Sequence, residues 1–225
     1  MPTIGLITEG PTDLQVLRLL LAGLCGSAYT ITELLPVAGA DGTYPPTGWT
    51  KVLSFIGDPE FDDALNNRDF PIDYVVSHLD SDSCELFMPP IPHSDDTNDV
   101  LTQIQQRLVQ LMEAVAPHFY ATYAHRILFA VAVRSTECWL LPLFYNDNTR
   151  TKTVNCLNSL NAALGRHGIT IDKSNKQFGY KALLRRDELK PRKLKRDTIL
   201  QISAFNPGFA DFVAQVETQI TPKEP

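Results

Sequence analysis

The chain has 225 residues, of which 44% are hydrophobic and 20% are charged. This composition is ordinary for a globular protein and excludes wholesale disorder, and the length suits one domain of good size or one domain with an appendage. No apolar run approaches a membrane span, and the first residues lack the charged and apolar segments of a secretory signal. We therefore expect a cytoplasmic protein that has no membrane partner.

The four cysteines lie far apart and form no CxxC pair: Cys25, Cys84, Cys138 and Cys156. A zinc site is therefore not expected, and reduced thiols are the default for a cytosolic protein. No cysteine has a histidine close in sequence, so we interpret all four as small buried or surface residues rather than nucleophiles.

The net charge of −6 is unevenly distributed along the chain. Residues 173–196 contain ten Lys or Arg and two acids, so this segment carries +8 and the remainder carries −14. Such segregation favours an acidic metal centre paired with a basic surface for a polyanion. A solvated helical face is the alternative interpretation of the basic segment.

The first element is an apolar, β-prone run over residues 3–8, followed by the sequence EGPTD. The glycine permits a turn and the proline suits the first position of a helix. Leucines recur at helical spacing from Leu14, which predicts a helix that ends near residues 23–26. This order places Glu9 at the carboxyl end of the first strand and Asp13 in the first turn of the helix.

A second strand is predicted over residues 30–37, followed by a Gly/Pro-rich loop and a short helix at 49–56. The third strand is the apolar run from Tyr74 to Asp82. It contains His78, which we interpret as a hydrogen-bonded core histidine in preference to a metal ligand.

Two carboxylates, Asp80 and Asp82, stand at the end of this third strand. In an open α/β sheet, chemistry collects where strands end, and side chains two residues apart on a strand point the same way. Like charges this close are costly unless a cation lies between them. The pair therefore indicates a divalent-metal site, with an acidic surface turn as the alternative.

The remaining elements complete an alternation of strands and helices. A proline-rich loop, a helix over residues 100–115 and a fourth strand over 126–134 follow, and then a short helix over 138–141 in which Trp139 is expected in the core. The pattern predicts an α/β fold with a parallel four-stranded sheet flanked by helices over residues 1–145. Residues 146–225 are predicted to form a basic helical extension packed on that domain.

Glu9 after the first strand and the Asp-x-Asp after the third resemble the pattern of the Toprim domain. That family includes topoisomerases, bacterial primases and nucleases of the overcoming-lysogenization-defect class, and the resemblance covers roughly residues 1–145. It implies a Toprim-like (Rossmann-like) fold. The sequence ECWLL at residues 137–141 further resembles small stand-alone Toprim proteins of bacterial defence systems.

The resemblance also implies the site residues. Glu9, Asp80 and Asp82 match the shared motif, with the two aspartates as metal ligands and Glu9 as ligand or general base. Asp13 and Glu137 match additions that help to hold a second ion in the nuclease subgroup. The implied cofactor is one or two Mg²⁺ or Mn²⁺ ions, which hard carboxylate oxygens select over zinc.

A cation that stabilises the transition state is also expected. Lys181 is the first candidate because we expect it to open the basic helix, and Lys176, Arg185 and Arg186 are its rivals. Steering of phosphates is expected of all four, and a solvated face remains the alternative.

The function expected from these features is a metal-dependent nuclease that cleaves DNA or a structured RNA such as tRNA. The resemblance implies a role as an effector of anti-phage defence or as a repair-associated enzyme. No P-loop is present, so any ATPase partner would be a separate chain. Two alternatives stay open: a non-catalytic Toprim-like module that binds a partner ATPase or sensor, and a phosphotransfer enzyme in which Asp80 is the nucleophile. The sequence does not indicate the oligomeric state.

Overall fold

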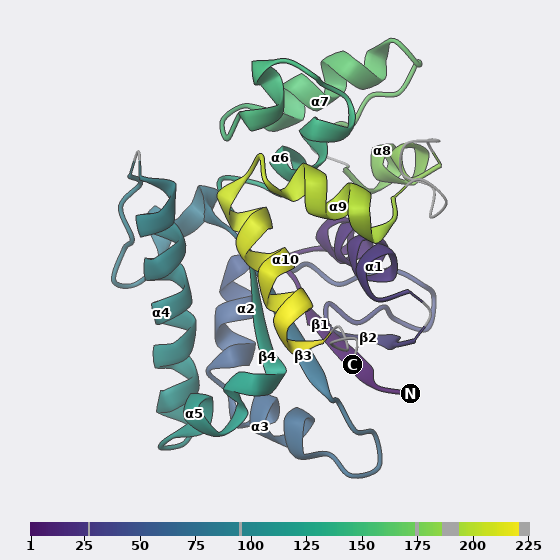
Figure 1. The fold of residues 1–225 in the computed structure, drawn as a ribbon. Helices are drawn as coiled ribbons and strands as arrows, with labels where there is room; N and C mark the ends of the chain where they lie inside the picture. The colour runs from purple at the N-terminus through teal and green to yellow at the C-terminus, as the bar shows by residue number, and fades with distance from the viewer. Residues whose placement is uncertain (27, 95, 174–175, 186–193, 221–225) are drawn as a thin grey trace.

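The computed structural model describes residues 1–26, 28–94, 96–173, 176–185 and 194–220. At its centre lies a four-stranded sheet, all parallel, with the strand order β2-β1-β3-β4 (Figure 1). The strands are β1 (Thr3–Ile7), β2 (Thr30–Leu35), β3 (Tyr74–Asp80) and β4 (Ile127–Ala132). The predicted α/β class and parallel four-stranded sheet are confirmed, and the topology is consistent with a Rossmann-like or Toprim-like fold.

Helices connect the strands and cover both faces of the sheet (Figure 1). They are α1 (Pro11–Cys25), α2 (Trp49–Ile56), α3 (Pro59–Asn66), α4 (Thr97–Val115), α5 (Phe119–Tyr123), α6 (Glu137–Leu140), α7 (Cys156–Gly165), α8 (Lys176–Leu183), α9 (Arg196–Ser203) and α10 (Pro207–Gln219). Short 3₁₀ segments cover Ser81–Leu86, Ala124–Arg126, Leu141–Leu143 and Asn148–Thr151. Within the described part of the chain, every helix is too short or too polar to cross a bilayer.

The sheet separates two hydrophobic cores, because successive side chains of a strand point to opposite faces. In β4, Leu128 and Ala130 face a core built with α1 and α6 to α10. Phe129 and Val131 face the opposite core, built with α2 to α5. Both faces are covered, which explains why the strands are continuous apolar runs rather than alternating ones.

Helix α10 lies against the edge strand β4 (Figure 1). A Cβ atom on Gly208 would lie 2.1 Å from the carbonyl oxygen of Val131, so only glycine permits this approach. Gln215 of α10 forms hydrogen bonds with the backbone of Phe129 at the free edge of β4. The N–H of Phe129 donates to Gln215 Oε1 at 2.8 Å, and Gln215 Nε2 donates to the carbonyl of Phe129 at 3.0 Å.

Trp139 is fully buried, as predicted, and stacks on Phe209 of α10 with a centroid distance of 4.9 Å. Residues before and after position 145 therefore share one core. The boundary between the two predicted domains stays a prediction.

Several elements differ from the expectations. Strand β3 ends at Asp80 rather than Asp82, because its pairing with β4 ends at Ala132 and the chain turns into a 3₁₀ segment. Helices α5 and α9 were not predicted. Helix α8 begins at Lys176, so the basic helix does not open at Lys181.

Candidate metal centre

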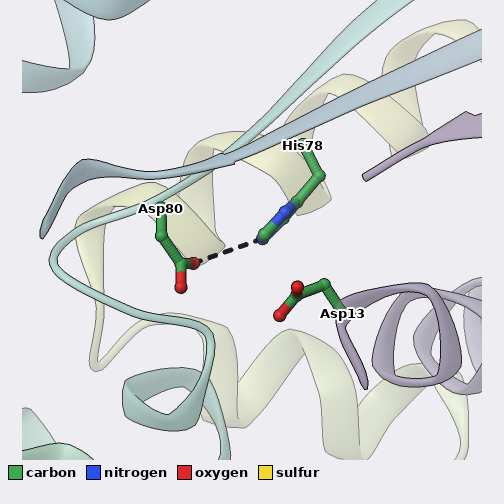
Figure 2. Close-up of side chains that lie close together, drawn as sticks. All are labelled: Asp13, His78 and Asp80. Carbon is green, nitrogen blue, oxygen red and sulfur yellow. Dashed lines mark ion pairs between the residues drawn. The ribbon is translucent and has the colours of Figure 1, made fainter. Parts of the chain in front are cut away.

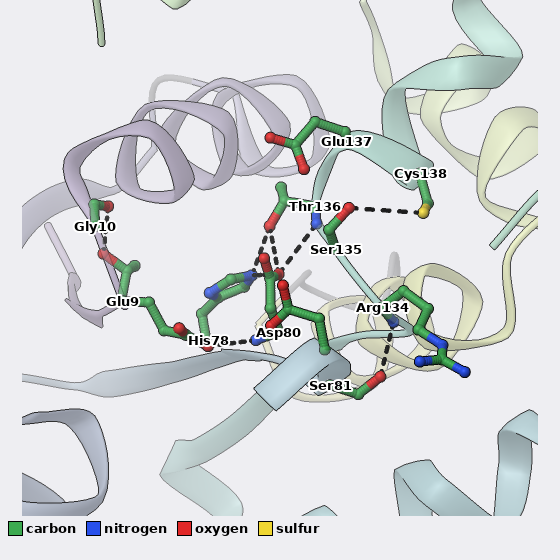
Figure 3. A network of polar contacts seen from close by, with 12 residues as sticks. Glu9, Gly10, His78, Asp80, Ser81, Arg134, Ser135, Thr136, Glu137 and Cys138 are labelled. Carbon is green, nitrogen blue, oxygen red and sulfur yellow. Dashed lines mark hydrogen bonds and ion pairs between the residues drawn. The ribbon is translucent and has the colours of Figure 1, made fainter. Parts of the chain in front are cut away.

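Buried and half-buried carboxyl groups from three parts of the chain meet at the carboxyl edge of the sheet. Glu9 follows β1, Asp13 lies in the first turn of α1, Asp80 ends β3 and Glu137 opens α6. Glu9 Oε1 accepts a hydrogen bond of 2.6 Å from the backbone N–H of Asp80, which joins the ends of two neighbouring strands (Figure 3). The structure thus brings together four of the five predicted metal-binding acids.

Thr136 fixes the orientation of Asp80. Its backbone N–H and its hydroxyl both donate to Asp80 Oδ1, at 3.0 and 2.9 Å (Figure 3). Thr136 is fully buried in the loop between β4 and α6. The position of the β3 carboxylate therefore depends on a residue that follows β4.

His78 supports the same arrangement from within β3. Its Nε2 lies 2.9 Å from Thr136 Oγ1. Because the single hydroxyl hydrogen of Thr136 is donated to Asp80, His78 Nε2 carries the hydrogen of this contact. Burial lowers the pKa of His78 to about 3, although the negative charge of Glu137 acts to raise it. The imidazole is therefore neutral. Its Nδ1 is buried without a hydrogen-bond partner among the described residues.

The donor set fits a hard divalent cation. Single ligand atoms of Asp13, His78 and Asp80 all lie within 4.8 Å of one another (Figure 2). With its Nε2 hydrogen directed at Thr136, His78 is a hydrogen-bond donor rather than a ligand. Carboxylate oxygens of Asp13 and Asp80 remain from this set, and Glu9 lies beside them through its hydrogen bond to the backbone N–H of Asp80. Such oxygens suit Mg²⁺ or Mn²⁺.

The charges of this cluster are poorly compensated by the protein alone. Burial, with the nearby charge of Asp13, raises the pKa of Glu9 to about 8. Burial and the charge of Glu137 raise the pKa of Asp13 to about 6. Burial, Asp13 and Glu9 raise the pKa of Asp80 well above its ordinary value. A bound divalent cation would reverse these shifts and keep the groups ionised.

Helix α8 supplies one cation to the cluster. Lys176 Nζ lies 2.8 Å from Glu137 Oε1, and the hydroxyl of Tyr180 donates to the same oxygen at 3.1 Å. Burial raises the pKa of Glu137, but the positive charge of Lys176 and its hydrogen bond lower this pKa. The lowering effects together outweigh burial, so the pKa of Glu137 lies below its ordinary value. Burial lowers the pKa of Lys176, and the attraction of Glu137, Asp13 and Asp80 more than reverses this. The two side chains therefore form a charged pair.

Asp82 does not share the burial of Asp80. The expectation that both side chains extend from one strand is wrong, because the strand ends between them. Asp82 is exposed, and its backbone N–H donates to the carbonyl of Arg134 at 3.1 Å. It lines a cleft of about 280 Å³ together with Glu137 and Lys176, so it stands at the rim of the cluster.

The basic residues predicted as phosphate contacts separate into different positions. Lys176 contacts the acidic cluster, whereas the side chains of Lys181 and Arg185 are exposed. Arg186 lies outside the described residues. Among the predicted cations whose placement is described, Lys176 is the one that the structure brings to the carboxylates.

The expectation that all cysteines are reduced is wrong in this structure. Cys138 and Cys156 form a disulfide, while Cys25 and Cys84 are free. The bond joins α6, directly after Glu137, to the first residue of α7. The two cysteines are 18 residues apart in sequence, and only the turn through the intervening 3₁₀ segments brings them together.

Thr136 and Tyr180 were missed as parts of the site. A hydroxyl residue directly before the carboxylate of Glu137 was the signal that could have identified Thr136. Tyr180 lies one helical turn from Lys176, and that spacing would have placed both on one face of a correctly bounded helix.

None of the protein-family models, curated proteins or solved structures compared with the chain gives a significant match.

Proposed function

We propose that this chain is a divalent-metal-dependent nuclease that hydrolyses phosphodiester bonds of DNA or of a structured RNA such as tRNA. The observation that carries the proposal is the convergence of Asp13 and Asp80, distant in sequence, in one buried cluster beside Lys176, with Glu9 hydrogen-bonded to the backbone of Asp80. The Toprim-like order of the acids along the sheet supports the same assignment.

Each side chain has a distinct role in this proposal. When bound, Mg²⁺ or Mn²⁺ would supply charge neutralisation and an activated water. Asp13 and Asp80 would hold the ion, with Asp80 oriented by Thr136. Glu9 Oε1 is engaged by the backbone of Asp80, which leaves Oε2 to bind the ion or to accept a proton.

Lys176 is the proposed transition-state cation in place of Lys181. Its ammonium group lies on the cleft of about 280 Å³ that also contains Asp82 and Glu137. A charged donor at this place stabilises the negative charge that develops on a phosphate oxygen during hydrolysis. Glu137 holds the lysine charged and directed toward the cluster until substrate arrives.

The alternative functions are less well supported. Buried carboxylates with raised pKa values cost folding free energy, which disfavours a purely structural role in a non-catalytic module. A phosphotransfer enzyme would need Asp80 as a nucleophile. Asp80 is only 8% exposed, and its Oδ1 already accepts two hydrogen bonds from Thr136.

The first test is a cleavage assay. Purified protein is incubated with plasmid DNA, linear DNA and tRNA in the presence of Mg²⁺, Mn²⁺ or EDTA. We expect cleavage of at least one substrate with a metal ion and none in EDTA. Cleavage that persists in EDTA would overturn the proposal, and so would inactivity on every substrate with both metals.

Asp80→Asn tests the centre directly. Asparagine keeps the shape and the acceptor for Thr136, so the protein should fold, while the rate falls by at least about 100-fold. Glu85→Gln is the matched control, because Glu85 is exposed on the same 3₁₀ segment and outside the buried cluster. Equal activity of Asp80→Asn and the control would refute the assignment.

A further inference from the structure

A second hollow with different chemistry adjoins the acidic cleft. It has a volume of about 100 Å³ and is lined by Arg134, His93 and four hydroxyl residues, namely Ser81, Ser94, Thr97 and Thr153. The described residues that line it include no carboxylate. A guanidinium group and several hydroxyl donors are the groups that bind a phosphate.

Arg134 is held at this place by its backbone. Its N–H donates to Ser81 Oγ at 2.7 Å, and its carbonyl accepts from the N–H of Asp82, so the residue bridges the ends of β3 and β4. Its φ of 65° is uncommon for a residue with a side chain. Positions of this kind persist where the surroundings fix them, and they cluster at functional sites.

The side chain of Arg134 is not used by the fold. Its guanidinium group makes no hydrogen bond or ion pair with any described residue, and it is directed away from Asp80 and Glu137 (Figure 3). Ser81 Oγ accepts from the backbone of Arg134, so its own hydrogen remains available for another acceptor.

The hollow and the acidic cleft lie next to each other. Arg134, Thr153 and Val154 line both of them. A chain whose scissile phosphate lies near Asp82 and Lys176 in the cleft would pass directly over Arg134.

We propose that Arg134 and this hollow bind a phosphate next to the scissile one on the nucleic acid strand. This inference rests on the proposed nuclease function and deepens it by assigning a substrate-positioning residue. The hollow accepts a single phosphate through its bidentate guanidinium and its hydroxyl donors. The contact is the same before and during the reaction, so it contributes to binding rather than to the chemical step.

Binding is tested without cleavage, with labelled single-stranded DNA and RNA oligonucleotides in EDTA, by fluorescence anisotropy at several salt concentrations. Arg134→Asn removes the cation with a residue that tolerates positive φ, and Arg134→Lys retains one charge. We expect Arg134→Asn to weaken binding about tenfold and to reduce the salt slope by about one phosphate contact. Arg134→Lys should keep the salt slope.

Arg68→Asn is the matched control, because this exposed arginine precedes β3 and lies toward the opposite edge of the sheet. Unchanged affinity and salt slope in Arg134→Asn would overturn the inference, as would wild-type protein that binds neither oligonucleotide. With metal, Arg134→Asn should raise KM while kcat stays within about threefold. If wild-type protein binds through Arg134 but cleaves nothing, the nuclease proposal fails and the phosphate site stands.

Discussion

Glu9 and Lys176 show how charge is distributed among the residues of the candidate site. Glu9 is held by the backbone of Asp80 and lies among other buried acids, so its ionised form is costly in the metal-free protein. Lys176 compensates Glu137 but leaves the cluster of Glu9, Asp13 and Asp80 short of positive charge. The uncompensated negative charges of these three side chains therefore favour the binding of a divalent ion beside them.

This imbalance predicts an unusual pH dependence of stability. The pKa of Glu9 rises from 4.5 to about 8 on folding, so the folded chain retains a proton that the unfolded chain releases. The contribution of Glu9 to the stability of the metal-free protein is therefore fully present at low pH. It is lost as the pH rises from 4.5 toward 8. The lowered pKa values of His78 and Glu137 have the opposite effect, because they make the stability fall as the pH falls. For His78 this occurs only below pH 6.5, and for Glu137 only below pH 4.5.

The measurement is urea unfolding in EDTA between pH 6.5 and 8. We expect the free energy of unfolding to fall by about 1.4 kcal/mol per pH unit for each retained proton. Glu9→Gln should flatten this slope, and Mn²⁺ should restore the stability of the wild-type protein at pH 8. A free energy that is constant or rises over this range in EDTA would show that the carboxylates are not buried together.

Among the helices, α10 depends on close contact with the edge strand β4. Gly208→Ala would place a Cβ atom against the carbonyl of Val131, and the helix would have to move away from β4. We expect a loss of about 1–3 kcal/mol in the free energy of unfolding, measured by urea denaturation. Gly165→Ala is the control, because its added Cβ meets no atom within 4 Å and should be neutral or slightly stabilising. Equal effects of the two substitutions would contradict the packing described for α10.

The elements were predictable where local patterns decide them. The strands and α1, α2 and α4 follow from apolar runs, from leucine spacing, and from glycine and proline at their ends. Helices α9 and α8 were missed or misplaced, because their burial depends on packing against α1 and not on a regular pattern of their own. The end of β3 at Asp80 is set by its pairing partner β4, which a single strand does not reveal.

The candidate site was predictable in part, because local sequence patterns place several of its residues at the ends of strands and helices. Glu9, Asp13, Asp80 and Glu137 follow strand ends or open helices, so a parallel sheet must gather them at one edge. The choice of Lys176 over Lys181 depends on where α8 begins and how it docks, which is tertiary information. The Cys138–Cys156 bond likewise depends on the path of the intervening 3₁₀ segments.

In the molecule as a whole, helices cover both faces of the sheet, and the candidate site lies at its carboxyl edge. The loops after β1, β3 and β4 meet there, and α8 adds its lysine to them. The acidic cluster, the cleft and the hollow at Arg134 are contiguous on this edge. We therefore predict one metal-containing centre with a phosphate-binding surface beside it.

The proposed metal centre can be observed by anomalous diffraction from crystals soaked in Mn²⁺. We predict at least one strong peak in contact with carboxylate oxygens of Asp80 and of Asp13 or Glu9, absent from crystals of Asp80→Asn treated in the same way. Peaks confined to surface acids, or none at all at saturating Mn²⁺, would contradict the account.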